Sequence, residues 1–305
     1  MLDKNLLLVD IGGTNIRYAY SNIGDSNFVS ENKAELDSLN DFDNLISKLL
    51  AKSDVKNIVF SVAGPKVNNS IKMTNRNFEI NADEIKKRFN LESCDLLNDW
   101  ESIGYSIRTF SENDFDIFKE GEPFNDTFLV IGPGTGLGAS VISGNYNVIA
   151  TEIGNTNLGL SALKSLLNIN SDEFNVLEDI ISGTGISRMF ETKTGKKVKS
   201  EEIFSLSQNG DNDAIEVTDM FTKAFARTLS DLSLVFSCGG GIILAGSLSR
   251  SFLPIANKDL FNKHFLDGKS DIHKEILYKV SIKVVNRGYT CLFGSLNYIN
   301  SIYSV

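Results

Sequence analysis

The sequence is short of several residue types that mark special classes of protein. It has three cysteines, four prolines and one tryptophan in 305 residues. The cysteines (Cys94, Cys238 and Cys291) are far apart and show no Cys-x-x-Cys spacing, so neither a disulfide framework nor a zinc site is expected. They are interpreted as reduced thiols of a cytoplasmic protein.

Long apolar runs and excess positive charge are also missing. No segment reaches the roughly eighteen consecutive apolar residues of a transmembrane helix, and the first residues lack the pattern of a signal peptide. The net charge of −9 disfavours nucleic acid or an anionic membrane as a partner. The same charge means that a site for any anionic ligand would need local backbone donors and a cation.

The composition present is that of a globular protein. Hydrophobic residues make up 42% of the chain and charged residues 23%, which is enough apolar material for a full core. The length favours about two domains. Apolar strand-like runs are mixed with helical periodicity, which predicts an α/β fold with mixed sheets. The predicted elements include a helix over 38–52 with a capping pair at Ser38 and Asp41, a strand over 57–63, a helix with Asn81 as its N-cap, an amphipathic helix over 213–236 and a final helix from about Tyr289. His264 and His273 lie in a charged stretch and are expected at the surface.

A strand, a glycine turn and a return strand occur twice. The first instance runs from Leu6 through Gly12-Gly13 to Tyr20, and the second from Thr127 through Gly134-Thr135-Gly136 to Ile142. Such an internal repeat is expected in a chain that contains a duplicated pair of similar domains.

Both turns have two interpretations. Glycines without a Cβ let the backbone bring several N–H donors to phosphate oxygens, and Asp10 could hold a hydrated Mg²⁺ beside them. Either turn could also be a plain hairpin that uses glycine for its geometry.

Two other phosphate-binding motifs are excluded. The second turn fits Gly-x-Gly-x-x-Ala, but a strand follows it where a dinucleotide fingerprint requires a helix. Gly154 and Gly159 have Walker A spacing, but Leu160 stands where that motif requires lysine.

Asn98-Asp99 follows a predicted strand and precedes a predicted helix. A carboxylate at this place can accept a hydroxyl proton, while the neighbouring amide can bind the same substrate. Asp99 would equally serve as a helix N-cap, and both roles are compatible.

Three further features are ambiguous when taken singly. Glu152 and Glu178 could bind sugar hydroxyls, since a carboxylate accepts several hydrogen bonds, or they could be solvated surface charges. The glycines of the 239–246 segment could admit an adenosine or simply end a helix.

The order of these motifs resembles the bacterial glucokinase family, within the hexokinase-like and actin-like ATPases, along nearly the whole chain. The residues that carry the resemblance are LLLVDIGGTNIR (6–17), SVAGP (61–65), MTNRNF (73–78), LLND (96–99), IGPGTGLG (131–138), TEIGN (151–155), EDIISGTG (178–185) and GGIILAG (240–246).

The resemblance implies two ribonuclease-H-like domains with mixed sheets, ATP and a hexose as substrates, and a homodimer. The smaller domain would comprise residues 1–105 and 288–305, and the larger one residues 106–287. Asp99 would be the catalytic base, and the sugar would be bound by Asn98, Asp99, Glu152, Asn155 and Glu178. ATP and Mg²⁺ would be held near Asp10, Gly12, Gly13, Thr14, Gly134, Thr135, Gly136, Gly240, Gly241 and Gly246.

One block departs from the family. Typical members read Gly-Glu-Gly-Gly-His around the glutamate, whereas this chain reads Thr151-Glu-Ile-Gly-Asn155. Asn155 therefore occupies the position of the family's histidine, which bonds hydroxyls near the anomeric carbon. The sequence thus predicts a kinase of glucose or of another hexose, and an actin-like or chaperone-like ATPase without a sugar substrate is the alternative.

Overall fold

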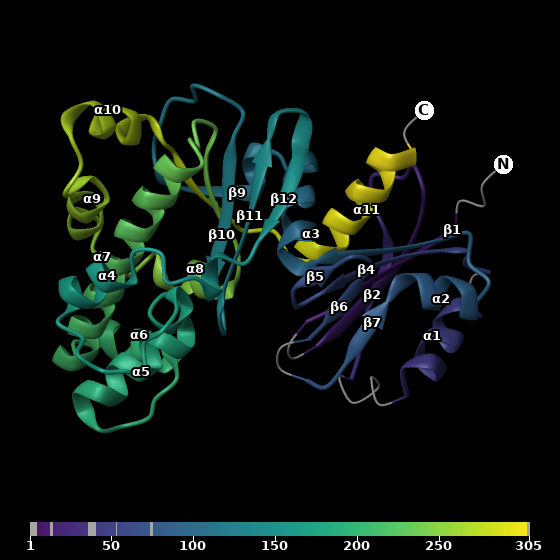
Figure 1. Cartoon of the computed structure of the whole chain (residues 1–305), viewed down its shortest axis with the longest axis horizontal. Coiled ribbons are helices and arrows are strands. Elements are labelled where there is room, and N and C mark those ends of the chain that lie inside the picture. Colours follow the sequence, from purple (N-terminus) through teal and green to yellow (C-terminus); the bar gives the residue numbers. More distant parts are fainter. Residues whose placement is uncertain (1–4, 13–14, 36–40, 53, 74–75, 304–305) are drawn as a thin grey trace. The chain divides into compact units, whose positions relative to one another are not determined.

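The structure is a computed structural model that describes residues 5–12, 15–35, 41–52, 54–73 and 76–303. Gly13, Thr14 and Ser38, which the sequence singled out, lie outside these residues. The chain forms two compact units, Met1–Phe110 with Arg287–Val305, and Ser111–Asn286. Each unit is an α/β structure with its own sheet and core (Figure 1).

The first unit is built on a sheet with strand order β3-β2-β1-β4-β8, and a smaller sheet has the order β5-β6-β7. Its elements are β1 (Asn5–Ile11), β2 (Ile16–Asn22), β3 (Val29–Ala34), α1 (Phe42–Leu50), β4 (Asn57–Val62), β5 (Lys66–Val67), β6 (Ser70–Lys72), β7 (Glu79–Asn81), α2 (Ala82–Arg88), β8 (Ser93–Asn98), α3 (Asp99–Ser106), the 3-10 turn η2 (Ile107–Thr109) and α11 (Thr290–Tyr303).

Both faces of the large sheet are covered, because alternate residues of β1 point to opposite sides. Leu7 and Val9 pack in the core that includes residues of α1 and α2. Leu6 and Leu8 pack instead with Leu292 and other residues of α11. Figure 1 shows α1 and α2 on one side of this sheet and α11 on the other.

The second unit has a sheet with strand order β12-β11-β10-β13-β14-β9. Its elements are η3 (Glu112–Asp114), β9 (Phe115–Lys119), β10 (Phe128–Pro133), β11 (Leu137–Ser143), η4 (Gly144–Tyr146), β12 (Asn147–Thr151), η5 (Ile153–Asn155), α4 (Leu160–Leu167), η6 (Leu177–Asp179), α5 (Gly183–Thr194), α6 (Ser200–Gln208), α7 (Asn212–Val235), β13 (Gly241–Leu244), α8 (Ser247–Phe252), α9 (Lys258–Leu266), α10 (Asp271–Lys279) and β14 (Ile282–Val285).

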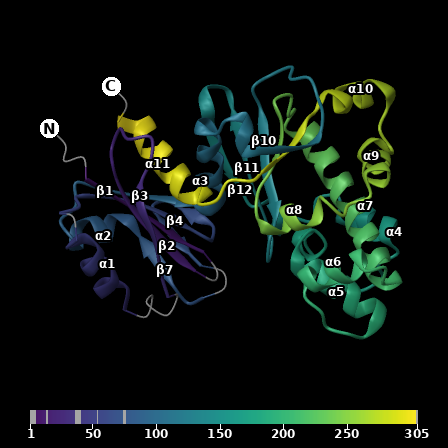
Figure 2. The same cartoon turned by 180° about the vertical axis from the view of Figure 1, so that it is seen from behind.

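Helix α7 is the centre of the second core. Its buried face includes Phe221, Phe225 and Leu229, each 0% exposed, and it contacts α4, α5, α6 and α9 (Figure 2). The sequence predicted an amphipathic helix over 213–236, and the observed bounds differ by one residue at each end. No helix in the described part of the chain is long and apolar enough to span a membrane.

The repeated strand, turn and strand pattern corresponds to a repeated topology. In the first unit β1 pairs antiparallel with β2 and parallel with β4, and in the second unit β10 pairs antiparallel with β11 and parallel with β13. In each unit the hairpin extends to a third antiparallel strand, β3 or β12. The predicted internal repeat therefore corresponds to the same strand order in both units, as expected for two similar domains.

The prediction that His264 lies at the surface is wrong. His264 is only 8% exposed, because α9 turns this residue toward the second core with Phe261 and Phe265. Burial lowers the pKa of His264, which favours the neutral imidazole in the folded protein.

Candidate functional site

In the first unit, the candidate residues gather where three parallel strands end. Strand β1 pairs in parallel with β4, and β4 pairs in parallel with β8. The register places Ile11 opposite Val62 and Val62 opposite Asn98, so Asp10 and Asn98 lie at the same edge of the sheet. Ligands of open α/β sheets bind outside such carboxyl ends.

Asn98, rather than Asp99, is the N-cap of α3. Its Oδ1 accepts hydrogen bonds from the backbone N–H of Trp100 at 2.8 Å and of Glu101 at 3.2 Å. The side chain of Glu101 accepts in turn from the Asn98 N–H at 3.2 Å, which completes a capping box. The possible capping role of Asp99 is thus taken by its neighbour.

Asp99 is the first residue of α3 and is half-buried. Its Oδ1 accepts a hydrogen bond from the Trp100 N–H at 3.0 Å. The positive end of the helix dipole stabilises the negative charge of a carboxylate at this position. An ionised carboxylate at the carboxyl end of a strand is suited to accept a proton from a bound hydroxyl.

Gly64 fixes the amide of Asn98 and was not identified from the sequence as a site residue. Its carbonyl accepts a hydrogen bond from Asn98 Nδ2 at 2.8 Å. Gly64 has a φ of +152°, and a Cβ there would lie 2.5 Å from the Lys72 carbonyl oxygen. The glycine that follows strand β4 and precedes Pro65 is the signal that could have found it.

Asp10 is 5% exposed and has a basic partner. Arg17 lies opposite it on β2 and donates from Nη1 to Asp10 Oδ2 at 3.2 Å. Burial raises the pKa of Asp10 and Arg17 opposes that rise. Among the described residues no group of three or more His, Cys, Asp or Glu side chains could hold a metal ion. A single buried carboxylate that is paired with an arginine suits a hydrated cation better than one bound directly by several protein oxygens.

Cys291 joins Asp10 to the first turn of α3. Its thiol donates to the Asp99 carbonyl oxygen at 3.8 Å and lies close enough to the Asp10 carboxylate to lower the pKa of that group. Burial, and then the Asp10 and Asp99 carboxylates, raise the pKa of Cys291 well above its ordinary value. The thiol of Cys291 is therefore protonated and acts as a donor. Nothing in the sequence around Cys291, at the start of α11, indicated this contact.

In the second unit, the turn of residues 134–136 joins β10 to β11 and is held by a bond within the turn and by bonds from α5. The Gly134 N–H bonds to the Gly136 carbonyl at 2.8 Å within the turn. From α5, the Gly183 N–H donates to the Gly134 carbonyl at 2.8 Å, and Thr184 Oγ1 donates to the Thr135 carbonyl at 2.8 Å. The turn is thus fixed to the start of a helix.

Glu178 is tied to the same turn. Its Oε2 accepts a hydrogen bond from the Leu137 N–H at 3.0 Å. A Cβ on Gly136 would overlap Glu178 Oε2, and a Cβ on Gly154 would overlap the Leu137 carbonyl and lie 3.1 Å from Glu178 Oε2. These two glycines therefore allow the carboxylate to approach. Glycine is required at position 136 by the packing of Glu178, independently of any bound phosphate.

Glu152 and Asn155 lie close to Glu178. They belong to the segment after β12, and the Asn155 N–H donates to the Glu152 carbonyl at 3.0 Å. The Leu177 N–H bonds to the Thr156 carbonyl at 2.7 Å, which joins this segment to η6. Partial desolvation, and then the neighbouring Glu178 carboxylate, raise the pKa of Glu152, although much of this residue is exposed. The arrangement presents two carboxylates and an amide, which suits a ligand with several hydroxyl groups.

The glycines of the 240–246 block separate into two groups. Gly246 follows the carboxyl end of β13, and a Cβ there would lie 3.6 Å from the Pro133 carbonyl, beside the 134–136 turn. Gly240 and Gly241 are buried at the amino end of β13, where a Cβ would meet the Phe128 ring or Ser281. Because β10 and β13 are parallel, this is the opposite sheet edge, so their placement does not support a shared nucleotide contact with Gly134.

Comparisons with known proteins agree with this arrangement of motifs. The family model for glucokinase matches residues 7–302. The glucokinase of Campylobacter jejuni subsp. doylei is 25% identical over 319 residues, covering 94% of this chain and 92% of that protein. The glucokinase of Sinorhizobium medicae is 27% identical over 284 residues, covering 86% of this chain and 83% of its own.

Solved structures show the same fold. The glucokinase from Balamuthia mandrillaris in complex with glucose superposes with a TM-score of 0.76 at 18% identity, covering 98% of this chain and 94% of that one. A glucokinase from an Antarctic psychrotroph gives a TM-score of 0.75 at 22% identity, covering 98% and 99%. The predicted fold class, with ribonuclease-H-like domains of the actin-like ATPase type, is thereby confirmed. The chain belongs to the glucokinase family.

Proposed function

We propose that the protein is an ATP-dependent hexose kinase that transfers the γ-phosphate of ATP to the 6-hydroxyl of glucose. The observation that carries this proposal is the match of the glucokinase family model to residues 7–302. The paired carboxylates Glu152 and Glu178 support it, because an ATPase without a sugar substrate would not need them beside a glycine turn.

Most of the candidate residues have a chemical role in this proposal. Asp99 accepts the proton of the 6-hydroxyl as its oxygen attacks the γ-phosphorus, and Asn98 binds a sugar hydroxyl. Glu152, Asn155 and Glu178 bind further hydroxyls of the hexose. Backbone donors of the 134–136 turn stabilise phosphate charge, with Gly246 beside that turn near the adenosine. The N–H of Gly12 donates to the Asn15 carbonyl at 3.0 Å, so Gly12 contributes by lacking a Cβ, which lets phosphate approach the first turn.

Magnesium is part of the proposed reaction. When bound, Mg²⁺ supplies positive charge that neutralises the β- and γ-phosphate oxygens. Asp10 is the carboxylate that would hold it, through water, because Arg17 already donates to one of the Asp10 oxygens. The homodimer expected from the family belongs to the same proposal, and light scattering on the purified protein would measure it.

A coupled ADP-release assay over a panel of hexoses tests the proposed function. ADP release that depends on sugar, with glucose among the best substrates, is expected. ATP turnover that is the same without sugar as with every hexose would favour the ATPase alternative and reject the kinase.

Replacing Asn155 by histidine is expected to raise kcat/KM for glucose about fivefold, because the imidazole reaches hydroxyls near the anomeric carbon that the shorter amide does not. One added hydrogen bond of about 1 kcal/mol gives this factor. Steady-state kinetics with glucose measures it. Asn157→His, two residues further along the same exposed segment, is the matched control and should leave kcat/KM unchanged. An Asn155→His variant with unaltered glucose kinetics would contradict the role of this position.

The affinity for glucose is expected to fall on acidification at a higher pH than an ordinary glutamate would cause. The raised pKa of Glu152 lies above the ordinary value of 4.5, so its charged, hydrogen-bond-accepting form is lost earlier as the pH falls. Sugar binding favours the ionised form and is therefore strongest above this pKa. The KM for glucose as a function of pH measures the effect, and Glu152→Gln should raise KM and flatten the profile. An equally steep profile in that variant would assign the titration to another group.

A further inference from the structure

Glu178 lies in a short segment that has to hold it beside another carboxylate. It is the middle residue of η6, a 3-10 turn of only three residues. Partial desolvation is the larger cause of the raised pKa of Glu152, and the Glu178 carboxylate is the second, so the two charges repel each other. Bonds from other elements must therefore keep Glu178 in place.

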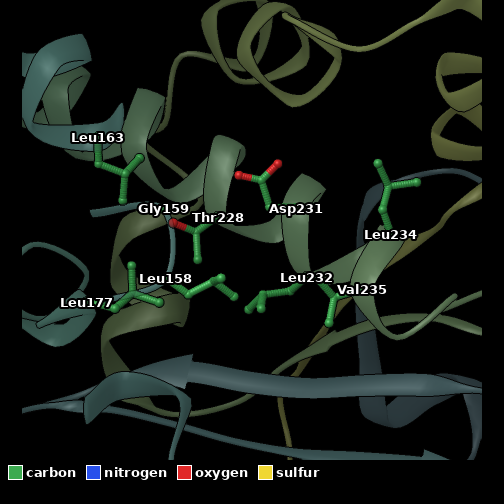
Figure 3. Close-up of a pocket in the computed structure, with 9 residues that line it drawn as sticks. All are labelled: Leu158, Gly159, Leu163, Leu177, Thr228, Asp231, Leu232, Leu234 and Val235. Carbon is green, nitrogen blue, oxygen red and sulfur yellow. The ribbon is translucent and has the colours of Figure 1, made fainter. Parts of the chain in front are cut away.

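Apolar packing beside η6 is incomplete. Leu177, its first residue, is 2% exposed and lines an apolar hollow together with Leu163 of α4 and Leu232 of α7 (Figure 3). Because the hollow interrupts close packing, Leu177 has fewer dispersion contacts on this side than a residue in a filled core. Polar bonds are therefore needed to fix the turn.

Arg188 of α5 supplies such bonds at both ends of the segment of residues 173–179. Its Nη1 donates to the Glu173 carbonyl at 2.7 Å and to Asp179 Oδ1 at 2.8 Å. The guanidinium carbon also lies 5.4 Å from the centre of the Phe174 ring, which is buried in the second core. A single side chain thus joins the whole segment to α5.

Asp179 connects Arg188 to the backbone that precedes Glu178. Its Oδ2 accepts hydrogen bonds from the N–H groups of Asn175 at 2.8 Å and Val176 at 3.0 Å, while Oδ1 accepts from Arg188. Partial burial opposes ionisation of Asp179, but the two backbone bonds and Arg188 outweigh it and lower the pKa. The carboxylate is therefore charged at neutral pH, with both of its oxygens bonded.

Ser182 fixes the main chain of Glu178 at the start of the same helix. Its hydroxyl donates to the Glu178 carbonyl at 2.6 Å and accepts from the Gly185 N–H at 2.9 Å. Ser182 is fully buried and is the N-cap of α5. Because the main chain is held in this way, Glu178 Oε2 can accept from the Leu137 N–H at 3.0 Å.

We infer that Arg188 is a positioning residue for sugar binding, because its bonds to Asp179 and to the Glu173 carbonyl keep the Glu178 carboxylate beside Glu152. Arg188 acts through the backbone of η6 rather than on the sugar itself. This role rests on the proposed function, in which Glu178 is a sugar ligand. Without the Arg188 bonds, repulsion between the two carboxylates moves Glu178 away from Glu152, and the hexose loses one acceptor.

The effect of losing Arg188 should be confined to the sugar. The 134–136 turn is held by the Gly183 N–H and the Thr184 hydroxyl, and neither bond involves the Arg188 side chain. Loss of an interaction that contributes equally to the ground state and the transition state raises KM and leaves kcat unchanged. A raised KM for glucose alone is therefore the expected sign of lost positioning.

Replacing Arg188 by methionine tests this role, because methionine keeps much of the apolar stem but has no charge and no donor. The KM for glucose should rise about tenfold, the factor for one hydrogen bond to a charged group, while kcat and the KM for ATP stay within about twofold of wild type. An unaltered KM for glucose in the folded variant would overturn the proposal.

Two conservative variants separate the bonds from the bulk of the side chain. Arg188→Lys should keep the KM for glucose within about threefold of wild type, because a single nitrogen makes both bonds and an ammonium group can do the same. If Arg188→Met does not fold, Asp179→Asn serves instead, since the amide oxygen can accept the two backbone bonds while the amide nitrogen cannot accept from Arg188. A lysine variant as impaired as the methionine variant would contradict the role of these bonds.

Arg227→Met is the matched control. Arg227 also bonds one carbonyl oxygen and one carboxylate oxygen, both of Asp267, at 2.6 and 3.2 Å. The two arginine side chains are similarly exposed, 29% for Arg188 and 21% for Arg227. Thermal unfolding should show a similar loss of stability in both variants, but the KM for glucose should rise only in Arg188→Met. An equal rise in both would assign the effect to stability and reject the positioning role.

Amide hydrogen exchange, followed by NMR, measures the positioning without sugar or activity. Exchange of the Leu137 N–H reports whether Glu178 Oε2 stays in place. It should be about tenfold faster in Arg188→Met than in wild type, and unchanged in Arg227→Met. An unchanged rate in folded Arg188→Met would overturn the proposal whether or not the protein phosphorylates a sugar. A faster rate in Arg188→Met, in a protein whose wild type shows no sugar-dependent ADP release, would reject the proposed function and confirm the bond between Arg188 and the Glu178 segment.

Discussion

Replacing Asp99 by asparagine is expected to lower kcat by about 10²–10⁴, the range of general-base assistance. The amide keeps the size of the side chain and can still accept the hydrogen bond from the Trp100 N–H, so α3 should begin as before. It cannot take the proton of the attacking hydroxyl. The measurement is kcat in the coupled assay with glucose, together with nucleotide affinity by calorimetry, which should stay within about twofold of wild type.

Asp95→Asn is the matched control for this variant. Asp95 lies on β8, four residues before Asp99, and accepts a hydrogen bond from the Tyr298 hydroxyl at 3.4 Å. Burial raises the pKa of Asp95, so loss of its charge should cost the fold little and leave kcat unchanged. Turnover close to the wild-type rate in Asp99→Asn would remove Asp99 from the role of base. A similar fall of kcat in both variants would point to a general effect on the unit.

Replacing Gly136 by alanine is expected to raise the KM for glucose by about 10- to 100-fold. The new Cβ would overlap Glu178 Oε2, so the carboxylate must move and the Leu137 N–H loses its acceptor. Loss of a buried hydrogen bond costs about 1–3 kcal/mol, and the displaced carboxylate no longer reaches its sugar hydroxyl. Steady-state kinetics with glucose and ATP varied separately measures the effect.

Gly134→Ala distinguishes the two glycines of this turn. A Cβ on Gly134 would meet nothing within 4 Å, so the turn and Glu178 should keep their positions. If Gly134 brings its backbone close to phosphate, the methyl group should raise the KM for ATP and leave the KM for glucose unchanged. Similar changes of both constants in both variants would contradict the separate roles assigned to Gly134 and Gly136.

Much of the local structure followed from the sequence because the governing interactions are local. The strand predicted over 57–63 is β4 (Asn57–Val62), and the final helix predicted from about Tyr289 is α11 (Thr290–Tyr303). Asn81 was expected to be an N-cap, and its Oδ1 accepts from the Glu84 N–H at 3.0 Å. Apolar periodicity and capping act within a few residues and can therefore be recognised in one dimension.

Short elements without such a signal were not predicted. The small sheet of β5, β6 and β7 contains strands of two or three residues, and its Ile71 and Ile80 are buried against the first core. Strands this short are stabilised by their neighbours rather than by their own composition. The contact of Cys291 with Asp10 was missed for a related reason, since nearly the whole chain separates these two residues.

The sequence by itself determined the two glycine hairpins, the helix that follows Asn98 and the order of motifs that identifies the family. Only the tertiary structure decided what each glycine does. Strand direction places Gly246 beside the 134–136 turn and Gly240 at the other edge of the sheet, and side-chain packing makes Gly136 the position that admits Glu178. The physical reason is that backbone turns are encoded by neighbouring residues, whereas the approach of a carboxylate to a turn depends on segments that meet only after folding.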